Sequence, residues 1–264
     1  MPPVSRAAVV SHGRTRDVSG ALKRLRATAA LAGVELLPDD EVDGADLVVV
    51  LGGDGTMLRA LTRTLDLAIP VIGVNFGRVG FLTSMGPDDL EAGLARAFAG
   101  EYRVAELATL DVEIGGTRHV AINDTVVAGS TLGRMIELDY AIRGEPIGSL
   151  PCDGLICATP AGSTAYNLSN GGPVLVWGLD AAVLSFVAPH SLHVRPLVIG
   201  RGSDLVVRNA SPEAQATVLI DGHAVGDLEP GADVSLCIGD RRSRIAMLPE
   251  QTFFRRYADV FGAA

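Results

Sequence analysis

Residues 48–59 read Val-Val-Val-Leu-Gly-Gly-Asp-Gly-Thr-Met-Leu-Arg, an apolar strand followed by a glycine-rich turn and then by helix-forming sequence. The three glycines remove side chains from the turn, so its backbone N–H groups can approach an anion at the positive end of the next helix. Asp54 is the one residue of the turn that can accept a proton. A carboxylate in a phosphate-binding loop indicates either a metal ion or a hydroxyl that must lose its proton. The turn therefore predicts phosphoryl transfer.

A second interpretation of the same turn makes Asp54 an ordinary helix cap, because Asp is favoured at that position. The turn also matches neither familiar phosphate motif. It has no Lys-Ser/Thr as in a P-loop and no third spaced glycine as in a dinucleotide fold. A different nucleotide-binding architecture is required.

Composition limits the class of protein. The chain has 264 residues, 48% of them hydrophobic, and a formal net charge of −9. This length suits one large or two modest domains, and the acidic balance argues against a nucleic-acid binder. No apolar run approaches the ~20 residues of a membrane span, and the first residues lack a signal-peptide pattern, so we expect a cytoplasmic protein. The cysteines, Cys152, Cys157 and Cys237, lack the spacing of a zinc or redox site.

The first hundred residues alternate between strand and helix patterns. Strands are expected at residues 7–10, 45–51 and 69–74, and helices at residues 19–32, 57–64 and 87–99. This rhythm predicts an α/β domain at residues 1–100, with a parallel sheet covered by helices.

The pattern changes after residue 100. Short β-prone runs separated by Gly, Pro, Asn or Asp predict an all-β sandwich domain at residues 101–250. These runs lie at residues 108–114, 118–122, 135–142, 181–187, 203–208, 216–220 and 234–238. Residues 251–264 carry aromatic side chains at helical spacing, which predicts a terminal helix that packs back on the first domain.

A second informative block spans residues 153–173. It reads Asp-Gly-Leu-Ile-Cys-Ala-Thr-Pro-Ala-Gly-Ser-Thr-Ala-Tyr-Asn-Leu-Ser-Asn-Gly-Gly-Pro. A strand at residues 155–158 leads to clustered hydroxyl groups and a short helix at residues 165–169, which suits a phosphate or a ribose. Tyr166 adds a flat surface for a base or a nicotinamide ring. An ordinary Ser/Thr-capped turn is the alternative for any short part of the block.

Other polar groups carry weaker signals. Asn123 and Asp124 follow a β-run at residues 120–122 and can bind an amide, a ribose or an amino group, but such a pair is equally a turn signal. Asp221-Gly222 is a favoured hairpin dipeptide, and the next residue, His223, is as well explained by a turn as by a ligand contact. The spacing of His190 and His193 does not predict a metal site, and no Gly-x-Ser-x-Gly elbow is present.

Five blocks occur in an order and at spacings that resemble the NAD kinase family. They lie at residues 52–56, 73–83, 123–124, 153–173 and 189–196. The match covers residues 48–221 and extends back to His12-Gly13-Arg14. The resemblance implies an α/β domain and a β-sandwich that enclose a nucleotide cleft, in a homodimer or homotetramer. It implies phosphoryl transfer from ATP or polyphosphate to the adenosine 2′-hydroxyl of NAD, giving NADP, with Mg²⁺ or another divalent cation on the donor.

The resemblance also assigns residues by position. Asp54 is the expected general base, and Gly52, Gly53, Gly55 and Thr56 form the expected phosphate-donor loop. Arg134 would neutralise the phosphates of NAD, Asp153 would contact a ribose and an amide, and Phe81 would form a stacking or packing wall. The full expected NAD-binding set is Asp54, Gly55, Phe81, Asn123, Asp124, Arg134, Asp153, Thr164, Ala165, Tyr166, Asn167, Leu168, Ser169 and His223.

Three positions depart from the family pattern. Pro151 stands where a polar or basic residue is expected, His223 where Gln is common, and Trp177 where a proline is usual. These departures are consistent with a changed preference between NAD and NADH, or with a paralogue that phosphorylates the ribose of another nucleoside or nucleotide. A non-catalytic nucleotide sensor on the same fold is a further alternative. Asp54 disfavours the sensor, because a protein that only binds has little use for a base.

Overall fold

The computed structural model describes residues 1–11, 16–38, 41–76, 80–131 and 133–262. The chain divides into two compact units, which we call the α/β unit (Met1–Glu106 with Arg242–Ala264) and the sandwich unit (Leu107–Arg241). Sequence analysis placed the corresponding boundaries at residues 100 and 250. His12-Gly13-Arg14, where the family resemblance begins, and residues 77–79 of the block at 73–83 lie outside the described residues.

The α/β unit is built on a parallel sheet. Its strand order is β2-β1-β3-β4, followed by the end of β16 beside β4. The strands are β1 (Arg6–Ser11), β2 (Glu35–Leu36), β3 (Leu47–Leu51), β4 (Val71–Val74) and β16 (Asp233–Met247). All five residues of β3 are buried, as expected for a parallel strand covered on both faces.

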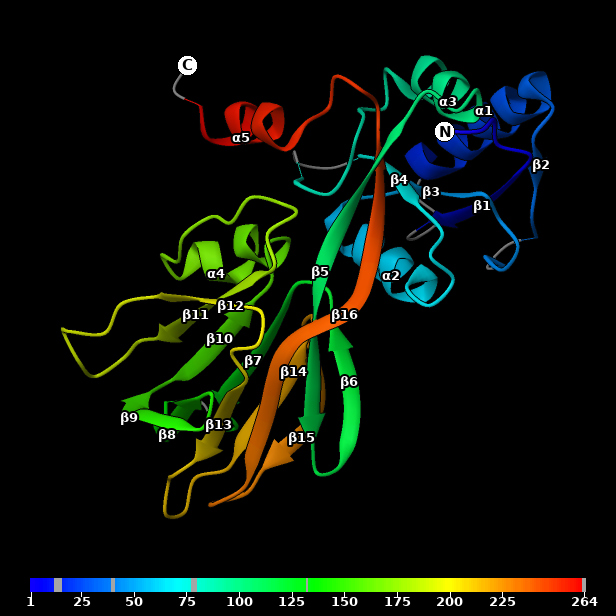
Figure 1. The fold of residues 1–264 in the computed structure, drawn as a ribbon. Helices are drawn as coiled ribbons and strands as arrows, with labels where there is room; N and C mark the ends of the chain where they lie inside the picture. Colours follow the sequence, from blue (N-terminus) through cyan, green and yellow to red (C-terminus); the bar gives the residue numbers. More distant parts are fainter. Residues whose placement is uncertain (12–15, 39–40, 77–79, 132, 263–264) are drawn as a thin grey trace. The chain divides into compact units, whose positions relative to one another are not determined.

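Helices cover both faces of this sheet (Figure 1). Helices α1 (Arg16–Ala32) and α3 (Leu90–Phe98) lie on one face and share a core with it that includes Leu25, Leu94 and Val49. Helix α2 (Asp54–Thr64) lies on the other face and buries Met57 and Leu61. Alternate residues of β3 serve the two faces, since successive side chains of a strand point in opposite directions.

Three of the predicted helix starts were wrong by three residues, and the first of these helices, α1, begins at Arg16 rather than at Ser19. Helix α2 begins at Asp54 rather than at Met57, because the N–H of Met57 already bonds to the carbonyl of Gly53 at 3.1 Å. Helix α3 begins at Leu90 rather than at Pro87, after a turn in which Asp89 N–H bonds to Gly86 O at 3.3 Å. The correction to α2 places Asp54 inside the first helical turn, directly after the glycines.

The sandwich unit consists of two sheets that pack face to face. One has the antiparallel order β12-β11-β10-β7-β14-β15, and the other contains β16-β13-β8-β9, with β5 pairing with β16 and β6. The first six are β12 (Leu197–Gly200), β11 (Ala181–Val187), β10 (Gly154–Ala158), β7 (Asp124–Gly129), β14 (Ala216–Ile220) and β15 (His223–Leu228). The others are β13 (Leu205–Asn209), β8 (Ile136–Ile142), β9 (Glu145–Cys152), β5 (Arg103–Ile114) and β6 (Thr117–Ala121).

One core joins the inner faces of the two sheets. Leu138 and Val207 of one sheet share it with Val127 and Leu155 of the other. Burial raises the pKa of the Cys157 thiol in this core to about 12, so the thiol is structural rather than reactive. The predicted class, an α/β domain followed by a β-sandwich, is confirmed.

The chain ends in helix α5 (Phe253–Phe261), which belongs to the α/β unit. Its first residue, Phe253, packs against Phe81, with ring centroids 5.6 Å apart. None of the helices in the described part of the chain is both long and apolar enough to cross a membrane.

Candidate functional site

The glycine-rich turn places Asp54 at the N-terminal end of α2. Gly53 is the N-cap, and no side chain caps the helix. The Asp54 carboxylate instead accepts hydrogen bonds from the backbone N–H groups of Phe81, at 2.8 Å, and Leu82, at 3.0 Å. The capping interpretation of Asp54 is therefore wrong. The carboxylate is half-buried and held in one orientation by a segment that follows β4.

The glycines around Asp54 serve different purposes. A Cβ on Gly80 would lie 2.2 Å from an Asp54 carboxylate oxygen, and a Cβ on Gly52 would lie 2.5 Å from the Thr56 hydroxyl. Both positions therefore need glycine for close packing. Among the residues that the structure describes, nothing lies within 4 Å of a Cβ on Gly55, so they leave the space beside it open. At the start of a helix the first N–H groups lack intrahelical partners, and an open approach to them suits an anion.

Thr56 and Phe81 lie deeper than the resemblance suggested. Thr56 is buried beneath the turn. Phe81 is only 6% exposed, and its ring lies 5.6 Å from that of Phe253 and 5.8 Å from that of Phe261. Of the two roles expected for Phe81, this environment favours the packing wall over a stacking surface.

In the sandwich unit, Asn123 and Asp124 connect β6 to β7. They were expected to end a β-run at residues 120–122, but β6 ends at Ala121 and Asp124 is the first residue of β7. The Asp221 carboxylate accepts hydrogen bonds from the backbone N–H groups of Ile122, Asn123 and Asp124 at 2.9, 2.7 and 3.2 Å. Asp221 was treated as a turn residue alone, and its long-range role is the main feature that sequence reasoning missed.

The geometry of the hairpin explains why Asp221 can reach so far. Asp221 joins β14 to β15 with a φ of 49°, and Gly222 follows with a φ of 82°. This pair of left-handed residues forms the tight hairpin turn that Asp-Gly favours. His223 is exposed, and its Nδ1 lies 3.0 Å from the Asp221 carbonyl oxygen.

Two buried carboxylates share this region. Burial, followed by the nearby Asp221, raises the pKa of Asp124 to about 7, and burial also raises the pKa of Asp221. At neutral pH the Asp124 carboxyl is therefore partly protonated, and then donates a hydrogen bond, and partly ionised, and then only accepts one. The Asn123 Oδ1 atom is buried, and no described residue donates a hydrogen bond to it, which marks it as an acceptor for a ligand.

The turn after β10 packs tightly against Asn123. The Thr159 hydroxyl donates to the Ile122 carbonyl at 2.6 Å, and a Cβ on Gly162 would lie 2.0 Å from the Asn123 carbonyl oxygen. The structure thus brings together the pair at 123–124 and the start of the block at 159–169, two features far apart in the sequence.

The residues of that block have different exposures. Tyr166 opens the short helix α4 (Tyr166–Ser169) and is 46% exposed, so its ring is accessible to a flat ligand. Thr164, Ala165 and Leu168 are half-buried, and Ser169 is exposed. Asn167 is fully buried, and its amide donates to the carbonyls of Ser163 at 3.1 Å and Pro173 at 3.0 Å. The position of Asn167 favours a role in shaping the turn over direct contact with a ligand.

Two further predicted residues lie at the other end of the same strands. Asp124 pairs with Ala158, whereas Asp153 precedes Gly154, which pairs with Ala128. Five strand residues separate Asp153 from Ala158, about 17 Å. Asp153 is exposed, and so is Arg134, whose guanidinium lies 3.4 Å from the Glu213 carboxylate. The predicted NAD-binding residues of the sandwich unit therefore form two groups, not one.

Comparison with known proteins agrees with these blocks. Residues 21–102 match the model of the ATP-NAD kinase N-terminal domain, and residues 122–248 match that of the ATP-NAD kinase C-terminal domain. An NAD kinase of Heliobacterium modesticaldum is 38% identical over 221 residues, which cover 82% of this chain and 78% of that protein. One of Leifsonia xyli subsp. xyli is 37% identical over 259 residues, covering 96% and 84%. The chain belongs to the NAD kinase family.

Structural similarity supports the family membership. An NAD kinase from Archaeoglobus fulgidus, solved in complex with ATP, has a TM-score of 0.79 and 28% identity, covering 97% of each chain. The suspected resemblance and the predicted kinase class are therefore confirmed. Membership in the NAD kinase family disfavours the sensor and paralogue alternatives.

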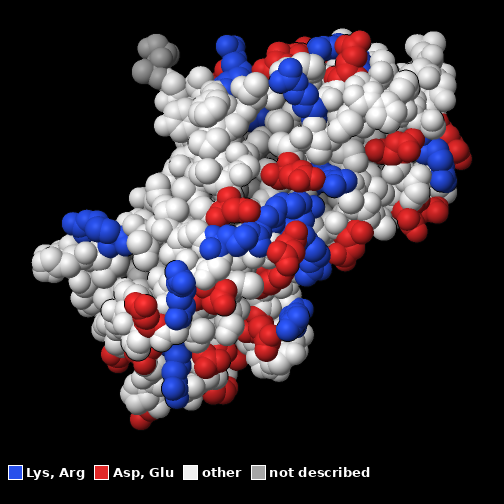
Figure 2. Space-filling model, in the orientation of Figure 1, with Lys and Arg blue, Asp and Glu red and all other residues white. Residues whose placement is uncertain are grey.

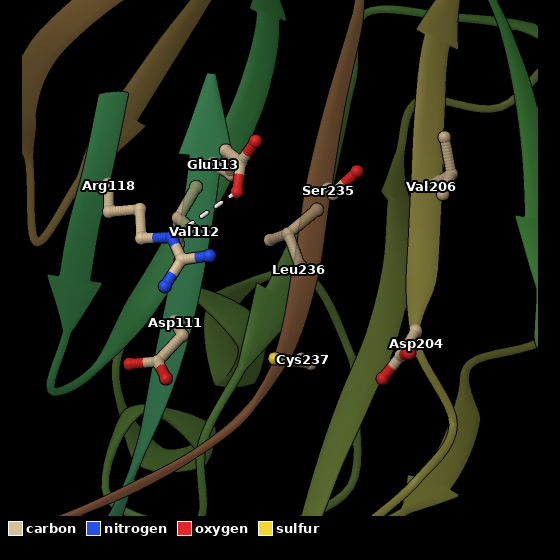
Figure 3. Close-up of a pocket in the computed structure, with 9 residues that line it drawn as sticks. All are labelled: Asp111, Val112, Glu113, Arg118, Asp204, Val206, Ser235, Leu236 and Cys237. Atoms are coloured by element: carbon tan, nitrogen blue, oxygen red, sulfur yellow. Dashed lines mark ion pairs between the residues drawn. The ribbon is translucent and has the colours of Figure 1, made fainter. Parts of the chain in front are cut away.

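Two surface features lie apart from the predicted residues. A pocket of about 370 Å³ in the sandwich unit is lined by β5, β6, β13 and β16, with the Arg118–Glu113 pair at 3.4 Å on one side and Asp204 on the other (Figure 3). It includes none of the predicted site residues that the structure describes. On the face drawn in Figure 2, basic and acidic side chains lie close together, in keeping with ion pairs such as Arg244–Glu106 at 3.1 Å.

Proposed function

We propose that the protein transfers a phosphoryl group to the adenosine 2′-hydroxyl of NAD, giving NADP, with Asp54 as the general base. The observation that carries the proposal is the fixed orientation of the Asp54 carboxylate at the open end of α2, held by the N–H groups of Phe81 and Leu82. Family membership supplies the substrate class, and the sandwich unit supplies the predicted residues for NAD.

The chemistry requires a positioned base. A ribose hydroxyl is a weak nucleophile at neutral pH, and a carboxylate within ~3 Å that accepts its proton contributes on the order of 10²- to 10⁴-fold to the rate. Each Asp54 oxygen accepts one backbone hydrogen bond and keeps a second lone pair for the ribose proton. The two backbone donors fix the direction of that lone pair without occupying it.

We place the donor phosphates at the glycines beside Asp54. ATP is the donor consistent with the Archaeoglobus fulgidus relative, and polyphosphate is the alternative. In the described residues no group of three or more His, Cys, Asp or Glu side chains is arranged to hold a metal ion. A divalent cation such as Mg²⁺ would be bound by the donor phosphates, whose charge it offsets.

The rest of the proposal follows the sequence assignments. NAD binds through Asn123, Asp124, Tyr166 and their neighbours, and the buried Asn123 Oδ1 accepts a hydrogen bond from an amino group of the ligand. We also propose that the protein is cytoplasmic and forms a homodimer or homotetramer. The departures at Pro151, Trp177 and His223 make the redox state of the preferred acceptor a separate question for assay.

The test is a direct assay with ATP and NAD that follows NADP formation. We expect Asp54→Asn to lower kcat on the order of 10²- to 10⁴-fold and to leave the KM for NAD within about threefold. Asp88→Asn removes an exposed carboxylate just before α3 and should change neither value. Near-normal kcat in Asp54→Asn would refute the role of the base. Turnover of another nucleoside or nucleotide in preference to NAD would favour the paralogue.

A further inference from the structure

Arg256 is a buried arginine in the C-terminal helix. It is 4% exposed, and burial lowers its pKa to about 10. A guanidinium in such a place needs acceptors that replace water. Arg256 donates to the carbonyl of Phe81 at 2.6 Å, to the carbonyl of Thr83, and to the hydroxyl of Ser84 at 3.2 Å. Helix α5 therefore binds one short segment of backbone through this side chain.

The same segment is bound from the other side by Asp54. The Asp54 carboxylate accepts hydrogen bonds from the N–H groups of Phe81 and Leu82, while Arg256 donates to the carbonyls of Phe81 and Thr83. Asp54 and Arg256 also attract each other electrostatically. The packing of Phe81 between Phe253 and Phe261 adds an apolar contact from the same helix. Residues 81–84 thus form a bridge between the carboxylate and the guanidinium.

We propose that Arg256 is a positioning residue for Asp54, which it orients through the backbone of residues 81–84. Arg256 holds the backbone carbonyls of residues 81–84 in place. Because the backbone is continuous, the N–H groups of Phe81 and Leu82 are held as well, and they orient the Asp54 carboxylate. The inference rests on the proposed role of Asp54 as the base. It extends the catalytic apparatus to the C-terminal helix, whose predicted role was packing alone.

A purely structural anchor would behave differently. Loss of an anchor lowers the stability of the fold but leaves the turnover of the folded fraction unchanged. Loss of a positioning residue lowers kcat in folded protein, because a misplaced reacting group costs on the order of 10- to 100-fold in rate. The KM for NAD should stay constant, since the hydrogen bonds of Arg256 to this segment go to backbone carbonyls and to Ser84, which is not in the predicted NAD-binding set.

The experiment compares Arg256→Lys and Arg256→Ala with Arg255→Lys. Arg255 is its neighbour on α5, is exposed, and pairs with Asp259 at 3.3 Å. We expect both Arg256 variants to lose kcat by about 10- to 100-fold with the KM for NAD within about twofold, and Arg255→Lys to match the parent protein. The assays are run at a temperature at which thermal unfolding curves show every variant folded. Arg256→Lys keeps the charge and carries the test if Arg256→Ala does not fold.

A double-mutant cycle with Asp54→Asn decides whether Arg256 acts through the base. We expect Asp54→Asn/Arg256→Lys to have the same kcat as Asp54→Asn within about twofold, because there is no longer a base to position. Amide hydrogen exchange at Phe81 and Leu82 should be faster in Arg256→Lys than in Arg255→Lys. Independent, multiplicative losses in the cycle, or normal kcat in folded Arg256→Lys, would overturn the proposal. Normal kcat in Asp54→Asn alone would refute the proposed function instead.

Discussion

The Asp221 carboxylate lies 2.7 Å from the backbone nitrogen of Asn123, a residue 98 positions earlier in the chain. With the bonds to Ile122 and Asp124, it satisfies three consecutive N–H groups. The link is mutual, because the Asp221 N–H donates to the Asp124 carbonyl at 3.0 Å. The β14–β15 turn therefore sets the backbone from which the Asn123 and Asp124 side chains project.

We predict that Asp221→Ala raises the KM for NAD on the order of tenfold and destabilises the protein by about 1–3 kcal/mol, because three N–H groups lose a buried acceptor. Asp221→Asn retains one acceptor oxygen and should fall between Ala and the parent. NADP formation and urea unfolding measure the two effects. Asp233→Ala removes an exposed carboxylate at the start of β16 and is the control. An unchanged KM in folded Asp221→Ala would contradict the prediction.

The raised pKa of Asp124 predicts a pH-dependent stability. An unfolded Asp titrates near ~3.9, whereas burial, and then Asp221, raises the pKa of Asp124 to about 7 in the folded protein. The folded state binds the proton more tightly. Its contribution to stability is therefore complete below about pH 4 and is lost as the pH rises through about 7.

The variant Asp124→Asn has no carboxyl at this position, so it does not lose stability through ionisation of that group as the pH rises. The free energy of unfolding of the variant, relative to the parent, should rise by about 1–3 kcal/mol between about pH 5 and about pH 8. Urea unfolding at several pH values provides the measurement. Asp153→Asn changes an exposed carboxylate in the same unit and should show a constant difference. Parallel curves for Asp124→Asn and the parent would disprove the assignment.

The glycines around Asp54 should respond in opposite ways. Gly80→Ala places a Cβ against the carboxylate, at 2.2 Å before relaxation, and should lower kcat on the order of 10- to 100-fold. Gly55→Ala meets nothing within 4 Å, so the melting temperature should not fall. If the donor phosphates approach that surface, the KM for ATP should rise on the order of tenfold. A normal KM for ATP in Gly55→Ala would show that the donor phosphates do not bind at this position.

The local patterns of the sequence predicted much of the fold. Strand β11 at residues 181–187 and strand β14 at residues 216–220 were predicted to the residue, because apolar runs were bounded by turn residues. The strand at residues 223–228 was missed, since His223, Gly226 and Asp227 carry no apolar alternation. Strand β16 continues to residue 247 through a charged stretch that reads as a loop. In these two cases strand pairing, not local composition, determines the structure.

The residues of the candidate site, like the strands, could be predicted from the sequence only in part. Asp54 was predicted from its turn, because a carboxylate among glycines at the start of a helix favours phosphoryl transfer. Asp221 and Arg256 were not found, because each acts on backbone atoms at residues about 100 or more positions away. Main-chain N–H and C=O groups have no sequence signature. A side chain that binds them is visible only after the fold is known.

The long strand β16 has a consequence for how the protein is made. It leaves the sandwich unit at Arg241 and adds a strand beside β4 to the sheet of the α/β unit, and the chain then continues into α5. Chains emerge from the ribosome N-terminus first, and domains generally fold as units. The sandwich unit, encoded without interruption, can therefore fold during translation. The loop that carries Asp54 must wait for residues 242–261, so a ribosome-bound intermediate would have its sandwich complete before Asp54, the proposed base, is in place.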